Sequence, residues 1–160
     1  MITRLFFLLT VISLGAWFSV ASAAGNSAAQ VYHKECSDCH IAYPTAFLST
    51  ASWDAVLNSL DKHFGENAEL SPGDLQSVKS YLETNNYDQS RIKSRYNGRF
   101  DTPGTPLRIT ETRFFQALHH EVPDRLVSGN PAVKTYARCE SCHRGAQNGS
   151  FDEDDVRIPH

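Results

Sequence analysis

The chain lacks an excess of basic residues, an apolar run long enough to span a membrane, and any methionine beyond the first residue. It has no basic excess, since 15 Lys and Arg face 18 Asp and Glu, so nucleic acid is a poor candidate partner. Its one long apolar run, residues 5–20, is shorter than the roughly 20 residues that span a bilayer. Methionine occurs only at position 1. The 160 residues are 41% hydrophobic, which suits one globular domain or two very small ones.

The first 23 residues have the pattern of a secretory signal peptide. Arg4 supplies a positive start, residues 5–20 form the apolar stretch, and Ala21-Ser22-Ala23 is a small-x-small cleavage site. Cleavage after Ala23 would export residues 24–160 and leave no stable membrane insertion. An uncleaved membrane anchor is the alternative interpretation of the same segment.

The four cysteines form two copies of one motif. Residues 36–40 read CSDCH and residues 139–143 read CESCH. Two thiols three positions apart lie on one side of a helical turn, where they can form thioethers with the two vinyl groups of one haem. The adjacent histidine then offers its imidazole to the iron. The motifs therefore predict two covalently bound haem c groups, attached through Cys36, Cys39, Cys139 and Cys142, with His40 and His143 as proximal ligands.

Three other uses of paired cysteines remain open at this point. A thioredoxin-like redox pair would not need the histidine and would lie in a βαβ pattern that the sequence lacks. A zinc site would leave the repeated histidine unexplained, and the two pairs lie about a hundred residues apart. Two disulfides would be common in an exported chain.

The lack of methionine restricts the sixth ligand of each iron. A Met sulfur raises the potential of many cytochromes c, and residues 24–160 contain none. The sixth position of each iron is therefore either filled by a second histidine, which would give a low potential, or left open. The remaining histidines are His33, His63, His119, His120 and His160.

Of these histidines, His63 is the distal candidate for the first haem. His119 and His120 compete for the second, because neighbours on a helix point about 100° apart. We favour His119, which follows Phe115 by one helical turn, and keep His120 as the alternative.

The apolar spacing predicts a mainly α fold. Helices are expected over residues 28–39, over 53–60 after an N-cap at Ser52, from Ser71-Pro72 to Asn85, and over 111–120 after Thr110. The order of the first three is similar to that of a class I cytochrome c. We therefore divide the chain into a signal peptide (1–23), a class I cytochrome c-like haem domain (24–90), a connector (91–110) and a loop-rich second haem-binding segment (111–160) wrapped around its haem.

Further matches extend over the whole chain after the signal peptide. They include Tyr43-Pro44, Ser52-Trp53, the run from His63 to Ala68, Ile109-Thr110-Glu111-Thr112, Phe115-x-x-x-His119-x-Glu121-Val122-Pro123, and Gly149-x-Phe151-Asp152. Together with the two haem motifs, this set resembles the small dihaem cytochromes c of proteobacteria. The resemblance implies a periplasmic protein with two bis-histidine haems, His63 and His119 being the distal ligands. It also implies electron transfer to a soluble c-type acceptor, an oxygen-binding monohaem cytochrome, and a membrane cytochrome b as a possible donor.

A six-coordinate iron has no position for a substrate, so we expect an outer-sphere electron carrier and not an enzyme. The alternative is a haem enzyme or gas-ligand binder, peroxidase-like or nitric-oxide-handling, with one open iron position. Two smaller expectations concern the first haem. Trp53 either belongs to the core or flanks the haem, and the carbonyl of Pro44 is a candidate acceptor for the second ring nitrogen of His40. The acidic run 152–155 is either a solvated tail or a docking patch for a basic partner.

Overall fold

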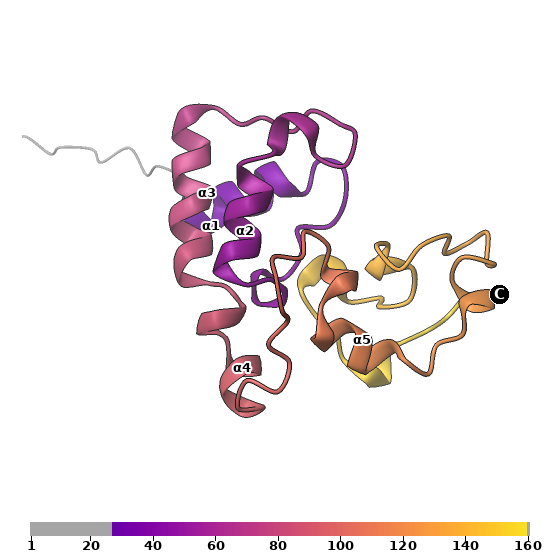
Figure 1. The fold of residues 1–160 in the computed structure, drawn as a ribbon. Helices are drawn as coiled ribbons and strands as arrows, with labels where there is room; N and C mark the ends of the chain where they lie inside the picture. Colours follow the sequence, from indigo (N-terminus) through magenta and orange to yellow (C-terminus); the bar gives the residue numbers. More distant parts are fainter. Residues whose placement is uncertain (1–26, 160) are drawn as a thin grey trace, which may run out of the picture.

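The computed structural model describes residues 27–159. The predicted signal peptide and His160 lie outside this range. Within it the chain is helical and loop-rich, and it has no β-strand beyond two isolated bridges. The helices, joined by loops and single 3-10 turns, are α1 (Ala28–Cys36), α2 (Thr50–Leu57), α3 (Pro72–Thr84), α4 (Arg91–Arg95) and α5 (Arg113–His119) (Figure 1). The predicted fold class is therefore confirmed.

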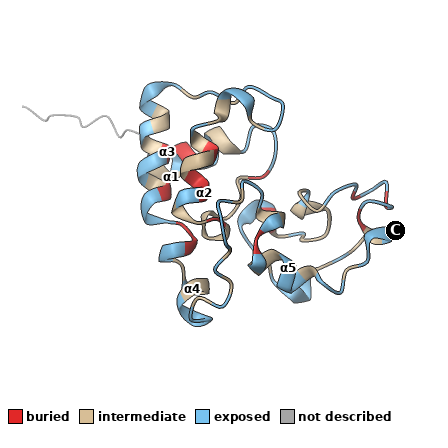
Figure 2. Ribbon diagram, in the orientation of Figure 1, coloured by how far each residue is buried: buried red, intermediate tan, exposed pale blue. Residues whose placement is uncertain are grey.

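The main hydrophobic core lies where α1, α2 and α3 pack together (Figure 2). Tyr32 of α1 and Val78 of α3 are essentially inaccessible to solvent. Burying one side chain of this size contributes about 1.5–3 kcal/mol, so these contacts dominate the stability of the first half. The buried members of the core are Val31, Tyr32, Leu48, Trp53, Val56, Val78 and Leu82.

Trp53 is a core residue. It is 8% exposed, its ring meets that of Tyr32 edge-on at 6.2 Å, and its indole N–H donates to the carbonyl of Thr45. The hydrogen bond satisfies the one polar group that burial of an indole would otherwise leave unpaired.

Side-chain caps begin the helices, and two of them differ from the sequence predictions. Ser27 starts α1 with a capping box, and Ser71 caps α3 as predicted. The N-cap of α2 is Ser49 and not Ser52, because the Ser49 hydroxyl accepts from the backbone N–H of Ser52 while Ser52 itself is buried.

The ends of α1 and α5 also differ from prediction. α5 is capped by Thr112 and not Thr110, so the helix starts two residues later than expected. α1 ends at Cys36 and not Cys39, because the chain leaves helical geometry at Ser37.

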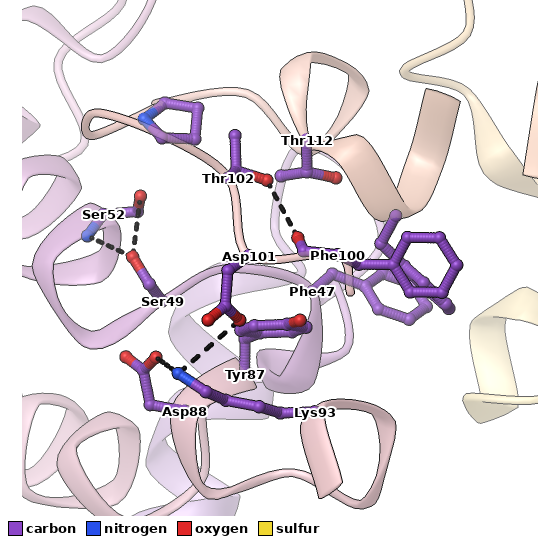
Figure 3. A pocket seen from close by; sticks show the side chains of 12 residues that line it. Phe47, Ser49, Ser52, Tyr87, Asp88, Lys93, Phe100, Asp101, Thr102 and Thr112 are labelled. Carbon is purple, nitrogen blue, oxygen red and sulfur yellow. Dashed lines mark hydrogen bonds and ion pairs between the residues drawn. The ribbon is translucent and has the colours of Figure 1, made fainter. Parts of the chain in front are cut away.

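Residues 91–110 are more ordered than the predicted connector. They begin with α4, which the sequence analysis missed. Lys93 of α4 lies between Asp88, at 3.1 Å, and Asp101, at 3.6 Å, and so ties the segment to the end of the first half (Figure 3). The three side chains line a cavity of about 210 Å³ together with Tyr87.

The second half has a small core of its own and, among its described residues, no closing helix. Val127, Val133 and Ala146 are buried between loops. The last described residues return to the second motif, where the N–H of Arg157 donates to the carbonyl of Cys142 at 2.8 Å. The side-chain amide of Asn130 holds the carbonyl of Pro159 at 2.7 Å. Backbone and amide hydrogen bonds therefore replace the missing helix.

Aromatic contacts join the two halves. The ring of Phe47 lies 5.8 Å from that of Phe114 and 5.3 Å from that of Phe151, so it packs between the start of α5 and the C-terminal loop. The second half therefore packs against the first through these rings. Within residues 27–159, no helix is long and apolar enough to cross a membrane.

Candidate functional site

The first motif follows α1 directly. Cys36 closes the helix half-buried, and Cys39 and His40 lie exposed on the loop that follows. The Nδ1 atom of His40 lies 2.7 Å from the carbonyl oxygen of Ile41, to which its N–H donates. The expected acceptor, Pro44, is therefore wrong, because the nearer carbonyl of the next residue takes the bond. Nδ1 is then protonated, which leaves the lone pair on Nε2 available.

A tight turn presents His63 to His40. His63 ends the 3-10 turn Leu60–Lys62, and the next two residues, Phe64 and Gly65, have positive φ angles of 52° and 105°. The reversal is closed by a hydrogen bond from the N–H of Glu66 to the carbonyl of His63. The two imidazole rings have centroids 6.2 Å apart and planes 28° from parallel. Burial, then His40, then Arg108 lower the pKa of His63, so its ring is neutral near pH 7.

The second motif lies on a 3-10 turn, Cys139–Ser141, and not on an α-helix. The N–H of His143 donates to the carbonyl of Cys139 at 2.8 Å, which folds the histidine back over the motif. The ring is half-buried, and burial followed by His119 lowers its pKa. Its Nδ1 is buried without a hydrogen-bond partner, whereas the Nδ1–H of His40 donates to a backbone carbonyl.

The last turn of α5 brings His119 to His143. The ring centroids lie 6.1 Å apart and the planes are 67° from parallel. The His119 ring stacks on Phe115 at 3.9 Å, and its Nδ1–H donates to the Phe115 carbonyl at 2.9 Å, so Nε2 is free. The ring is therefore held in one orientation by its neighbour one turn earlier.

His120 has different surroundings. Its side chain is 70% exposed, and its Nε2 lies 3.8 Å from a carboxylate oxygen of Glu121. Its Nδ1 donates to the carbonyl of Ala117. The structure brings only His119 of this adjacent pair to His143. His33 is exposed, and its ring packs edge-on against Tyr32.

The thiols lack the surroundings of redox-active cysteines. Burial, with a smaller contribution from Glu35, raises the pKa of Cys36 to about 12. Burial, with Glu140 next, raises that of Cys139 to about 11. A redox pair needs a thiol whose pKa is lowered, and burial has the opposite effect at Cys36 and Cys139. Within residues 27–159, no group of three or more His, Cys, Asp or Glu is arranged to hold a metal ion, and the histidines above meet in twos.

The comparisons with known proteins agree on one family. Residues 32–151 match the family model described as dihaem cytochrome c. The chain belongs to the dihaem cytochrome c family. It therefore binds two haem c groups and is a haem-based electron-transfer cytochrome. No curated protein matches the chain.

Two solved structures resemble this dihaem cytochrome c over nearly their full length. A diheme cytochrome type c from Shewanella baltica OS155 is 35% identical, with a TM-score of 0.68, and the match covers 82% of this chain and 94% of that one. A diheme cytochrome c from Rhodobacter sphaeroides is 37% identical, with a TM-score of 0.65, covering 76% and 94%. The resemblance inferred from the sequence motifs is thus confirmed.

Two side chains at the first site have no counterpart in the sequence prediction. The guanidinium of Arg108 lies 4.0 Å from the ring centroid of Phe64, the neighbour of His63. The ring of Tyr43 stacks on that of His40 at 4.7 Å, with planes 23° apart. Tyr43 carries part of the family resemblance, but only the fold shows where its ring lies. Arg108 has no local signal, because its contact is with a residue more than forty positions away.

Proposed function

We propose that this dihaem cytochrome is an exported, periplasmic outer-sphere electron carrier in which each iron is held between two histidines. His40 and His63 would ligate the first haem, and His143 and His119 the second. Cys36 and Cys39 would hold the first haem covalently, and Cys139 and Cys142 the second.

The spacing of the paired imidazoles is the observation that carries this proposal. A metal–imidazole bond is about 2.0 Å long, and about 1.2 Å more separates the bonded nitrogen from the ring centre, so two imidazoles on opposite sides of one iron have centroids about 6.4 Å apart. The two pairs measure 6.2 Å and 6.1 Å. In each pair the two histidines are more than twenty positions apart in the sequence. Their spacing is therefore set by the tertiary fold and not by a local turn or helix.

The ligand set has a direct consequence for reactivity. Bound haem supplies a one-electron iron couple, and two imidazoles on it leave no position for a substrate. His40 and His119 each donate Nδ1–H to a backbone carbonyl, which leaves Nε2 free as the ligand atom and would limit rearrangement of the rings when the charge on the iron changes. With no methionine sulfur in residues 24–160, the potentials fall on the low side for cytochromes c. These features favour electron transfer over catalysis.

An acidic surface beside the second haem motif supports a soluble acceptor. Residues 152–155 are exposed, and the next residue, Val156, forms a backbone bridge with His143. Negative charge close to a redox centre would speed encounter with a cytochrome that carries a basic face. We infer a soluble c-type cytochrome as acceptor, with the oxygen-binding monohaem class and a membrane cytochrome b donor following from the family resemblance.

The test is a redox titration of the purified protein combined with a haem count. The expected result is two covalent haems per chain, one electron each, with both potentials below that of a His/Met cytochrome c measured in the same cell. Cys142→Ala should weaken covalent attachment of the second haem only, and Cys39→Ala that of the first only. A potential in the His/Met range, or rapid turnover of hydrogen peroxide, would contradict the carrier assignment.

A further inference from the structure

Tyr43 contacts both halves of the molecule at its two haem motifs. Its ring stacks on His40 with planes 23° apart, and its hydroxyl donates to the carbonyl of Ala137 at 2.7 Å. Ala137 lies two residues before Cys139, and the Cys139 sulfur is 3.9 Å from the same carbonyl oxygen. One side chain thus extends from the proximal ligand of the first motif to the carbonyl two residues before the first cysteine of the second.

This hydrogen bond has no equivalent elsewhere in the described chain. Among residues 27–159 it is the only hydrogen bond that directly joins 27–90 to 111–159, and its two ends are 94 positions apart. The other contacts between these halves that were described above, around Phe47, are aromatic and do not involve a motif residue.

We propose that Tyr43 is a positioning residue that couples the two haem sites, fixing their separation and forming a path between them that consists of one ring contact, covalent bonds and one hydrogen bond. The proposal rests on the ligand assignment of His40 given above. The electron that passes between the centres oxidises one and reduces the other, no bond forms or breaks, and Tyr43 keeps its proton. Electronic coupling decays less through bonds and hydrogen bonds than across an unfilled gap, so a ring on one ligand and a hydroxyl at the other motif favour rapid exchange.

Two substitutions separate the contributions of the ring and the hydroxyl. Tyr43→Phe keeps the ring on His40 and removes the hydrogen bond to Ala137. Tyr43→Leu removes both. Tyr136→Phe is the matched control, because the Tyr136 hydroxyl also donates to a backbone carbonyl, that of Val122 at 2.9 Å, but within the second half.

The first measurement is the rate of electron exchange between the haems, from NMR exchange of their methyl resonances in partly reduced holoprotein. The geometric mean of the forward and reverse rate constants removes the effect of any change in driving force. The expected result is a several-fold decrease in Tyr43→Phe, a larger one in Tyr43→Leu, and no change in Tyr136→Phe.

A second measurement follows the position of the second motif without using electron transfer. Loss of one hydrogen bond should make amide hydrogen exchange of residues 137–143 about threefold to tenfold faster in Tyr43→Phe. Exchange between the haems that is unchanged in Tyr43→Phe, whatever the amide protection, overturns the proposal, and this comparison decides the matter even if Tyr43→Leu does not fold. Failure of the wild-type protein to bind two haems would instead refute the proposed function.

Discussion

Replacing His119 and His120 one at a time gives a sharp test of the second ligand pair. His119 lies 6.1 Å from His143 between ring centroids, whereas the side chain of His120 is 70% exposed and contacts Glu121. His119→Ala should therefore open the sixth position of one iron, and His120→Ala should open none. Because the chain carries two haems, the reduced His119→Ala protein should bind one carbon monoxide per two haems, and half of its haem should become high-spin.

The substitution should leave the fold intact. His119→Ala removes the stacking of its ring on Phe115, a contribution of about 0.5–1.5 kcal/mol, and its hydrogen bond to the Phe115 carbonyl, about 0.5–1.5 kcal/mol, whereas a domain is stable by about 5–15 kcal/mol. The change in ligation can thus be measured on folded protein.

The assay is a carbon monoxide titration of each reduced variant, followed by visible spectroscopy against a pyridine haemochrome haem count. His120→Ala is the internal control, since it alters the neighbouring position of the same chain. Carbon monoxide binding by His120→Ala and not by His119→Ala would reverse the ligand assignment. Binding by neither variant would show that both histidines lie off the iron.

Three further outcomes follow from charge, packing and protonation. Arg108→Gln removes a positive charge beside the first haem site. Loss of this charge stabilises the oxidised haem, which is the more positive state, relative to the reduced haem. One midpoint potential should therefore fall by roughly 40 mV in a redox titration, the equivalent of about 1 kcal/mol. Leu82→Ala, at 2% exposure, should cost about 2–5 kcal/mol in thermal unfolding, whereas exposed Leu107→Ala should change stability by under about 0.5 kcal/mol. The pKa values of His63 and His143 are lowered in the folded state, so the unfolded chain binds more protons than the folded one in acid. The stability that these histidines contribute above the ordinary pKa of 6.5 should therefore be lost as the pH falls. An acid titration should show this loss together with a change of the haems from low-spin to high-spin.

The parts of the fold that the sequence predicts well have strong local signals. The Ser71-Pro72 start of α3 is confirmed, and Val78 and Leu82 of this helix lie in the core. The errors at α2 and α5 arise where a helix start offers several hydroxyl residues close together, because each of them can cap and the sequence alone does not choose between them. α4 is a five-residue helix without an apolar face, and its Lys93 pairs with two aspartates outside it, so no periodic signal announces it.

The site residues likewise fall into those with a local sequence signal and those that depend on the tertiary fold. The cysteines and proximal histidines are read directly from two five-residue motifs. The distal histidines are separated from the proximal ones by 23 and 24 positions. The lack of methionine narrows the candidates for the sixth ligand to a few histidines. Only the turn at Phe64-Gly65 and the packing of Phe115 show how the paired rings meet. Tyr43 acts across 94 positions, and its contact with Ala137 depends on how the two halves pack.

The central claim, two irons each held by two imidazoles, is tested most directly by electron paramagnetic resonance of the oxidised wild-type protein, with carbon monoxide added after reduction. Both haems should be low-spin and insensitive to carbon monoxide. The two signals should differ, because ligand planes 28° apart split the iron orbitals more than planes 67° apart, so the His119–His143 centre should give the larger maximum g value. A high-spin signal in the native protein, or ready carbon monoxide binding by either haem, would contradict the ligand assignment and favour ligand binding or catalysis at the open iron.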